Sequence, residues 1–267
     1  MSGPAARSRS EVAIRQALLE RILRLAGPEA ILVGGQALAF WASHYGVALP
    51  LSAVTKDADF LGQRADVARI ARGLGGQAHY VHEEALTALV GQVTKDLPGG
   101  DYINIDVLFR LHGDITTNAV RARAAVIELA GVTFKVLHPM DVLQGRLENL
   151  YSLKDKQDEH GVAQLALAIT MARAFMTEEA TRGHGDGHSD GAGGKGSRRR
   201  PVVLLHVARV SAMARSDAGR KVARRFKVHV ADAIAAQALA GLPAFTAKEL
   251  PLLAPLMSKA GQREQGL

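Results

Sequence analysis

The sequence has no cysteine among its 267 residues, which excludes disulfides and thiolate metal sites. It also lacks any apolar run near the roughly 20 residues that a membrane-spanning helix needs. There is no Gly-x-x-x-x-Gly-Lys loop and no His-Glu-x-x-His pair, and no serine is placed in a strand-to-helix nucleophile elbow. P-loop NTPases, zinc proteases and α/β-hydrolases are therefore excluded.

The first residues, "MSGPAARSRSEVAIRQ", are basic but are not followed by an apolar segment. This pattern does not fit a secretory signal, and we expect a cytoplasmic protein. The whole chain is basic, with a formal net charge of +7, and much of the excess lies in "SRRRP" and "RSDAGRKVARRFK" beyond Arg198. Such a balance favours polyanionic partners, although basic proteins rich in Ala and Arg are also common without one.

Up to residue 137, helical periodicity alternates with short strand-like runs. A helix capped by Ser10 is predicted to end at Gly27, and another is predicted at 63–76. The segment 29–46 reads as strand, Gly-Gly turn and helix. Further strands are predicted in 55–62, on both sides of the Pro-Gly-Gly turn in 89–109, and in a hairpin that pivots on Gly131. This order predicts an α+β fold with a small mixed sheet flanked by helices.

After residue 137 the pattern becomes helical. We expect a catalytic core at 1–137, a helical module at 138–182, and a basic helical tail at 201–267. The segment 183–200 is rich in glycine and almost devoid of apolar residues, which indicates a flexible linker.

Three aspartates are placed at or inside predicted strands. Asp57 and Asp59 are two residues apart, so on a strand they point to the same face. Asp106 lies between Ile105 and Val107, where a buried carboxylate needs a partner. If the two strands are neighbours, the three charges repel one another unless divalent cations neutralise them. That arrangement suits two-metal chemistry on phosphates.

Other interpretations of the aspartates stay open. Asp57 and Asp59 could mark a solvated start of a strand, and Asp106 could pair with Arg110. Gly34 and Gly35 allow backbone N–H groups to approach an anion where a strand meets a helix N-terminus, although a Gly-Gly pair alone is more often just a turn.

Three lysines are candidate phosphate ligands. Lys154 and Lys156 could bind a triphosphate as point charges, or they could belong, with Asp155 and Asp158, to a solvated charged turn. Strand alternation points Lys56 away from the aspartates, but it could reach a phosphate if the strand begins with a twist.

The segments "VGGQALAFWASHYGV", "TKDADFL" and "INIDVLF" resemble the nucleotidyltransferase superfamily with the polymerase-beta-like fold. With "LHPMDVLQGRLENL" and "HGVAQLALAI", the stretch of roughly residues 10–180 is similar to minimal bacterial nucleotidyltransferases of the abortive-infection toxin kind. The chain departs from the family in two places. "GVALPLSAVT" lengthens the gap before Asp57 and could form part of an acceptor site, and Gln36 stands where many relatives carry a small residue.

The resemblance implies a role for each site residue. Gly34 and Gly35, together with Gln36, would hold the nucleotide phosphates. Asp57 and Asp59 would bind two Mg²⁺ ions, for which Mn²⁺ could substitute. Asp106 would complete the metal site and help to deprotonate the attacking hydroxyl.

The expected reaction transfers a nucleoside monophosphate from a triphosphate such as ATP to a hydroxyl group. The acceptor could be the 3′ end of an RNA, a protein side chain or a small molecule. The resemblance also suggests a toxin with an antitoxin partner. The alternative is a non-catalytic protein on a degenerate nucleotidyltransferase scaffold, which binds nucleic acid or a partner through the basic tail.

Overall fold

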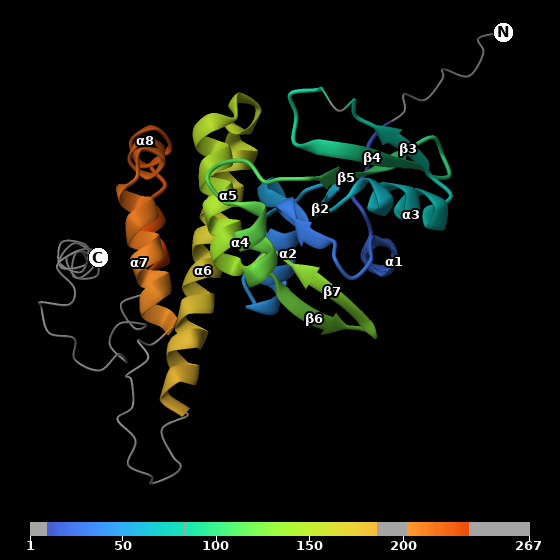
Figure 1. Ribbon diagram of the computed structural model, residues 1–267. Helices are drawn as coiled ribbons and strands as arrows, with labels where there is room; N and C mark the ends of the chain where they lie inside the picture. Colours follow the sequence, from blue (N-terminus) through green and yellow to red (C-terminus); the bar gives the residue numbers. More distant parts are fainter. Residues whose placement is uncertain (1–9, 83, 186–201, 235–267) are drawn as a thin grey trace, which may run out of the picture. The chain divides into compact units, whose positions relative to one another are not determined.

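A computed structural model describes residues 10–82, 84–185 and 202–234 (Figure 1). The chain divides into two compact units. The first contains Met1–Ser43 and Ala48–Gly145, and the second contains His44–Val47 and Arg146–Leu267. Among the described residues, no helix combines the length and the apolar character needed to cross a membrane.

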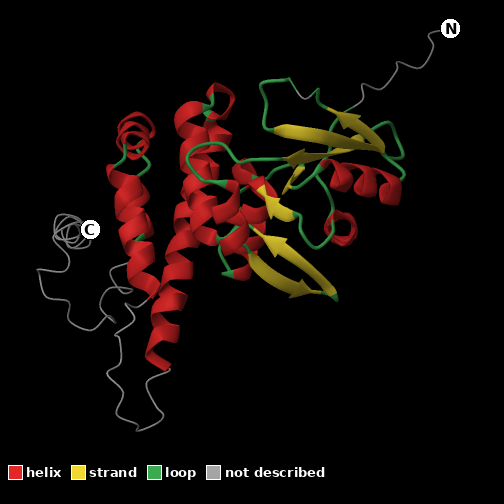
Figure 2. Cartoon of the chain, in the orientation of Figure 1, coloured by secondary structure: helices red, strands yellow, loops and turns green. Residues whose placement is uncertain are grey.

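The first unit is built on a seven-stranded mixed sheet (Figure 2). The strand order is β3-β4-β5-β2-β1-β7-β6. The strands are β1 (Ile31–Val33), β2 (Ala58–Leu61), β3 (Gln77–Tyr80), β4 (Leu89–Asp96), β5 (Tyr102–Leu108), β6 (Ala125–Leu129) and β7 (Val132–Val136). β2 runs parallel to β5, and β1 is antiparallel to β2 and parallel to β7. The predicted α+β fold with a small mixed sheet is confirmed.

Helices accompany this sheet. They are α1 (Gln16–Ala26), α2 (Gly34–His44), α3 (Arg64–Leu74), α4 (Thr117–Arg123) and the first part of α5 (Pro139–Ser152), with a 3₁₀ turn at Leu51–Ala53. α3 has the strongest local signals: Gln63 and Asp66 form a capping box, and Gly75 ends the helix in the left-handed conformation. Its apolar face is buried against the sheet. β3 and α4 were not expected from the sequence.

Alternation along β5 gives the sheet two different faces. Three aliphatic residues of β5 are fully buried, namely Ile103, Ile105 and Val107. Gly91 pairs with Val107, and a Cβ on Gly91 would lie 3.2 Å from a methyl group of Val67 in α3. This face of the sheet is therefore covered by α3. Asn104 and Asp106 alternate with the buried residues and so lie on the opposite face, which we call the acidic face.

The prediction that Ser10 caps the first helix is wrong. α1 begins only at Gln16, after Arg15. Residues 10–14 are extended instead: Glu11 forms a parallel bridge with Tyr102, and the Ile14 N–H donates to the Lys56 carbonyl at 3.3 Å. The backbone of this segment is used in sheet-like pairing, which local helical periodicity does not reveal.

The second unit is helical in its described residues. It contains the end of α5, a 3₁₀ turn η2 (Lys154–Lys156), α6 (Glu159–Gly185), α7 (Val202–Arg215), α8 (Asp217–Phe226) and a 3₁₀ turn η3 (Val230–Ala233). α6 and α7 lie side by side (Figure 1), with the rings of Phe175 and His206 in edge contact at 4.9 Å. α6 continues through residues 183–185 of the expected linker, and residues 186–200 lie outside the described residues.

A buried ion pair fixes the end of the first unit. Asp141, in the first turn of α5, has no solvent exposure, and Arg123 at the end of α4 binds it with two nitrogens at 3.1 and 2.8 Å. The bidentate geometry compensates for the loss of hydration of a fully buried carboxylate.

Replacing Arg123 by alanine should leave the buried Asp141 carboxylate without the positive charge of Arg123. Because Arg123 itself is partly exposed, we expect a loss near the lower end of the usual range, about 3 kcal/mol in the free energy of unfolding. Urea denaturation measures this quantity. Arg72→Ala, at an exposed position on α3, is the control and should change stability by less than about 0.5 kcal/mol.

Candidate metal centre

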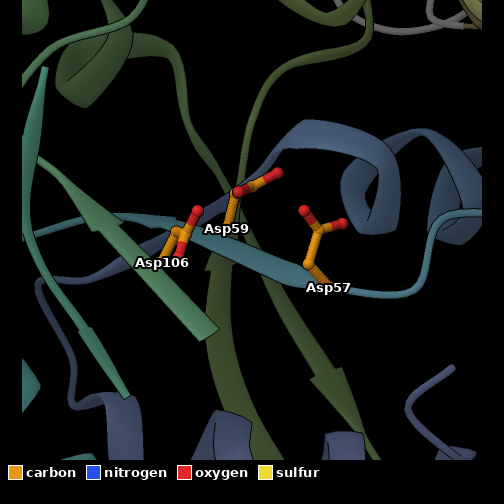
Figure 3. Close-up of side chains that lie close together, drawn as sticks. All are labelled: Asp57, Asp59 and Asp106. Atoms are coloured by element: carbon orange, nitrogen blue, oxygen red, sulfur yellow. The ribbon is translucent and has the colours of Figure 1, made fainter. Parts of the chain in front are cut away.

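Three aspartates converge on the acidic face (Figure 3). Asp59 is in β2, Asp57 is the residue that precedes this strand by one position, and Asp106 is in β5. The parallel pairing of β2 and β5 sets Asp59 directly beside Asp106. One oxygen of each carboxylate lies within 4.8 Å of the other two, and all three residues are half-buried. The structure thus brings together the three aspartates singled out in the sequence.

One oxygen of each carboxylate lies near enough to the others for a cation to draw them together. Two oxygens bound to one Mg²⁺ at about 2.1 Å stand at most about 4.2 Å apart, so oxygens spread over up to 4.8 Å must move closer to share a single ion. Two ions about 3.5–4 Å apart, bridged by a carboxylate, also fit a cluster of this size. The donor set consists entirely of hard oxygens, which suits Mg²⁺ or Mn²⁺.

The turn from β1 to α2 touches the triad through glycine. Gly34 has a φ of +65°, and a Cβ at this position would lie 1.8 Å from Oδ2 of Asp59. A Cβ on Gly35 would lie 2.5 Å from the side chain of Thr55. α2 begins at Gly34, so the first backbone N–H groups of the helix are at the same place as the carboxylates.

Neighbouring polar side chains orient Asp57 and Asp106. The Thr55 hydroxyl donates a hydrogen bond to Asp57 Oδ1. Two amides donate to Asp106 Oδ1, Gln92 from β4 at 2.8 Å and Asn104 from β5 at 3.0 Å. Arg110, the alternative partner considered for Asp106, has its guanidinium carbon 5.4 Å from the centre of the Phe109 ring.

Gln36 connects the glycine turn with the triad. Its side-chain amide donates to the Asp57 carbonyl at 3.2 Å. This bond ties the first turn of α2 to the backbone just before β2. In the described structure Gln36 is therefore in a position to hold Asp57 in place, a contact that the sequence did not indicate.

The predicted lysine ligands are placed differently from one another. Lys56 is exposed next to Asp57, and its charge acts on Glu11. Lys154 and Lys156 are exposed on η2 in the second unit, and Lys156 lies 3.5 Å from the carboxylate of Asp155. This geometry matches the alternative of a solvated charged turn for η2.

A fourth acidic residue near the triad was missed in the sequence. Glu11 pairs with Tyr102, so its side chain shares the face that Asn104 and Asp106 occupy. Partial burial raises the pKa of Glu11 above its ordinary value; the charge of Asp57 raises it further, Lys56 lowers it and Asp106 raises it. Only the pairing of residues 10–14 with the sheet, which is invisible to local patterns, places Glu11 here.

The Gly34 position gives a direct test of the metal centre. We expect Mg²⁺ or Mn²⁺ to raise the Tm of the protein, because a ligand that binds the folded state stabilises it. Gly34→Ala should remove this rise, since the added methyl group overlaps Asp59. Gly131→Ala is a matched control: Gly131 has a φ of +69° but no atom within 4 Å of a Cβ, so it should destabilise the fold and keep the cation effect. An equal cation response in both variants would contradict the assignment.

The pKa of Glu11 predicts a pH effect in the absence of cations. The raised pKa means that the folded protein holds the Glu11 proton more tightly than the unfolded chain does. The free energy of unfolding therefore falls as the pH rises and Glu11 ionises. Glu11→Gln should therefore stabilise the protein in EDTA at neutral pH, by less than about 0.5 kcal/mol because the groups are partly solvated. The gain should vanish below the ordinary value of 4.5. Thermal melts at several pH values, with Glu20→Gln as control, measure this difference.

Comparison with known proteins gives few matches. No family model matches the sequence, and no curated protein sequence matches it. Among solved structures, the chain is similar to JHP933 from Helicobacter pylori, with 15% identity over 62% of this chain and 74% of that chain. The TM-score of this match is 0.37, which is too low to carry an argument about fold or function. The metal centre therefore stands on its own geometry.

Proposed function

We propose that the protein is a metal-dependent nucleotidyltransferase, which transfers a nucleoside monophosphate from a nucleoside triphosphate to a hydroxyl acceptor. The observation that carries the proposal is the convergence of Asp57, Asp59 and Asp106 within 4.8 Å, beside the Gly34–Gly35 turn. Three carboxylates held at such a distance repel one another unless cations share their charge. A nucleoside triphosphate with its divalent cations would supply the positive charge that these carboxylates need.

The glycine turn supports a phosphate at this position. The first N–H groups of α2 have no partner within the helix, and the positive end of the helix dipole lies there as well. With no side chain at Gly34 or Gly35, Asp59 and Thr55 pack directly against this turn, so a cation bound by Asp59 would bring a phosphate close to the first N–H groups of α2. The carboxylates would repel a bare triphosphate, so its binding here depends on divalent cations.

The roles of the aspartates follow from their places. Asp57 and Asp59 would hold the ions on the side of the glycine turn, and Asp106 would complete the site. The bound ions would supply charge stabilisation for the attacking oxygen and for the leaving pyrophosphate. As the acceptor oxygen bonds to the α-phosphorus, the bond to the pyrophosphate oxygen breaks, and the carboxylate of Asp106 takes up the hydroxyl proton. Gln92 and Asn104 keep Asp106 in orientation through this step.

The proposal includes Mg²⁺ as the cofactor, with Mn²⁺ as a substitute, and a cytoplasmic location, where nucleoside triphosphates are available. An RNA 3′ end, a protein side chain or a small molecule remains the proposed range of acceptors. A toxin role with an antitoxin partner extends the proposal, and unimpaired bacterial growth on regulated expression of the intact protein would count against it.

Labelled triphosphates test the reaction directly. The full-length protein is incubated with each α-labelled nucleoside triphosphate, Mg²⁺ and total cellular RNA or protein, and incorporation of label into macromolecules is measured. Asp59→Asn should reduce incorporation by roughly a hundredfold or more, because metal ions supply several kcal/mol to such reactions. EDTA should have the same effect.

The matched control is Asp114→Asn, at an exposed position in a loop of the same unit; it should leave incorporation unchanged. If the wild-type protein incorporates no label from any triphosphate into any fraction, the non-catalytic alternative on a degenerate scaffold is favoured. If Asp59→Asn and Asp106→Asn incorporate label as well as the wild type, the reaction takes place elsewhere and the site assignment is wrong.

A further inference from the structure

A second candidate binding site lies within the helical unit. A cavity of about 330 Å³ opens beside α8, a volume at the lower end of the range for small-molecule sites. Tyr151 at the end of α5, Gln157 after η2, and α8 residues 221, 222 and 224–226 form its lining. Nothing in the proposed transfer reaction makes use of this cavity.

The lining combines cations with aromatic rings. Lys221, Arg224 and Arg225 contribute three positive charges. The Lys221 Nζ lies 5.5 Å from the centre of the Tyr151 ring, and the guanidinium carbon of Arg225 lies 4.9 Å from that of Phe226. The lining therefore sets positive charge beside two aromatic rings, a combination that suits a ligand that is both aromatic and anionic.

The charges of α8 are only partly neutralised. Its single acidic residue, Asp217, accepts from Lys221 at 2.8 Å and from the Tyr151 hydroxyl at 2.8 Å. These contacts lower the pKa of Asp217 and raise that of Lys221, so both stay ionised around neutral pH. Arg225 donates to the neutral side chain of Gln157 at 2.6 Å. Arg224 makes no ion pair within the part of the chain that the structure describes.

We propose that this cavity binds a nucleotide unit, with the phosphate held by Arg224 and Arg225 and the base packed against Tyr151 and Phe226. A nucleotide matches the lining better than an acidic peptide, because carboxylates would use the cations but leave the rings without a partner. The same chemistry could come from a free nucleotide or from one unit of a single-stranded RNA. This site does not depend on the proposed transfer reaction.

Fluorescence anisotropy of the full-length protein with a short labelled single-stranded RNA, in EDTA, tests the proposal. Arg224→Ala should weaken binding roughly tenfold and reduce the slope of log affinity against log salt by about 0.7, the value for one phosphate contact on a single strand. Phe226→Leu keeps an apolar side chain but removes the ring, and should also weaken binding roughly tenfold through lost stacking. Arg220→Ala is the control: the residue is on the same helix but outside the lining, and its loss should change affinity little.

Competitors identify the source of the ligand. Displacement of the RNA by a nucleoside monophosphate but not by inorganic phosphate supports a site for a free nucleotide. RNA binding that no mononucleotide displaces, yet which Arg224→Ala and Phe226→Leu both weaken, supports a site for a strand. The proposal is overturned if both variants bind RNA like the wild type, or if polyglutamate competes as well as RNA. Asp59→Asn should bind RNA normally, so a failure of the metal centre and a failure of this site are separate results.

Discussion

Repulsion between three carboxylates is the constraint that shapes the first unit. Asp57, Asp59 and Asp106 are half-buried, and one carboxylate oxygen of each lies within 4.8 Å of the other two. A fold selected for stability alone would separate such charges or pair them with arginine. Neutral donors orient two of these carboxylates: a hydroxyl from Thr55 donates to Asp57, and amides from Gln92 and Asn104 donate to Asp106. A neutral donor fixes a carboxylate in place without adding a positive charge to it.

Asp141 is held in a different way from the aspartates of the triad. Asp141 is fully buried and receives two charged hydrogen bonds from Arg123, which cancel its charge and tie α5 to α4. The triad is only half-buried, and the donors to Asp57 and Asp106 include uncharged groups. The Asp141 pair serves the stability of the fold, whereas three carboxylates gathered in one place oppose it through mutual repulsion. Such local costs in stability are typical of functional sites.

Local sequence patterns predicted the parts of the site that depend on local geometry. The alternation in "NIDVLF" placed Asp106 on one face of a strand, and the Asp-x-Asp spacing placed Asp57 and Asp59 on one face of a second predicted strand. The prediction that the three aspartates meet assumed that their two strands are neighbours, and β2 and β5 are neighbours in the sheet. Gln92 and Glu11 were missed because their places depend on strand register and on the pairing of residues 10–14 with Tyr102. The same pairing explains why the first helix starts later than its periodicity suggests, and the absence of an apolar alternation in "QAHY" explains why β3 was not recognised.

The two proposed sites would bind phosphate in opposite ways. On the acidic face, carboxylates would require divalent cations before a phosphate could approach, so binding would be coupled to metal ions that also stabilise charge during a reaction. On α8, arginine and lysine would attract phosphate directly and hold it without a means of activating it. The first arrangement suits a substrate that must react, and the second suits one that must only be retained. Together the two proposals assign the retention of a nucleotide or nucleic acid to one site and the chemistry to the other.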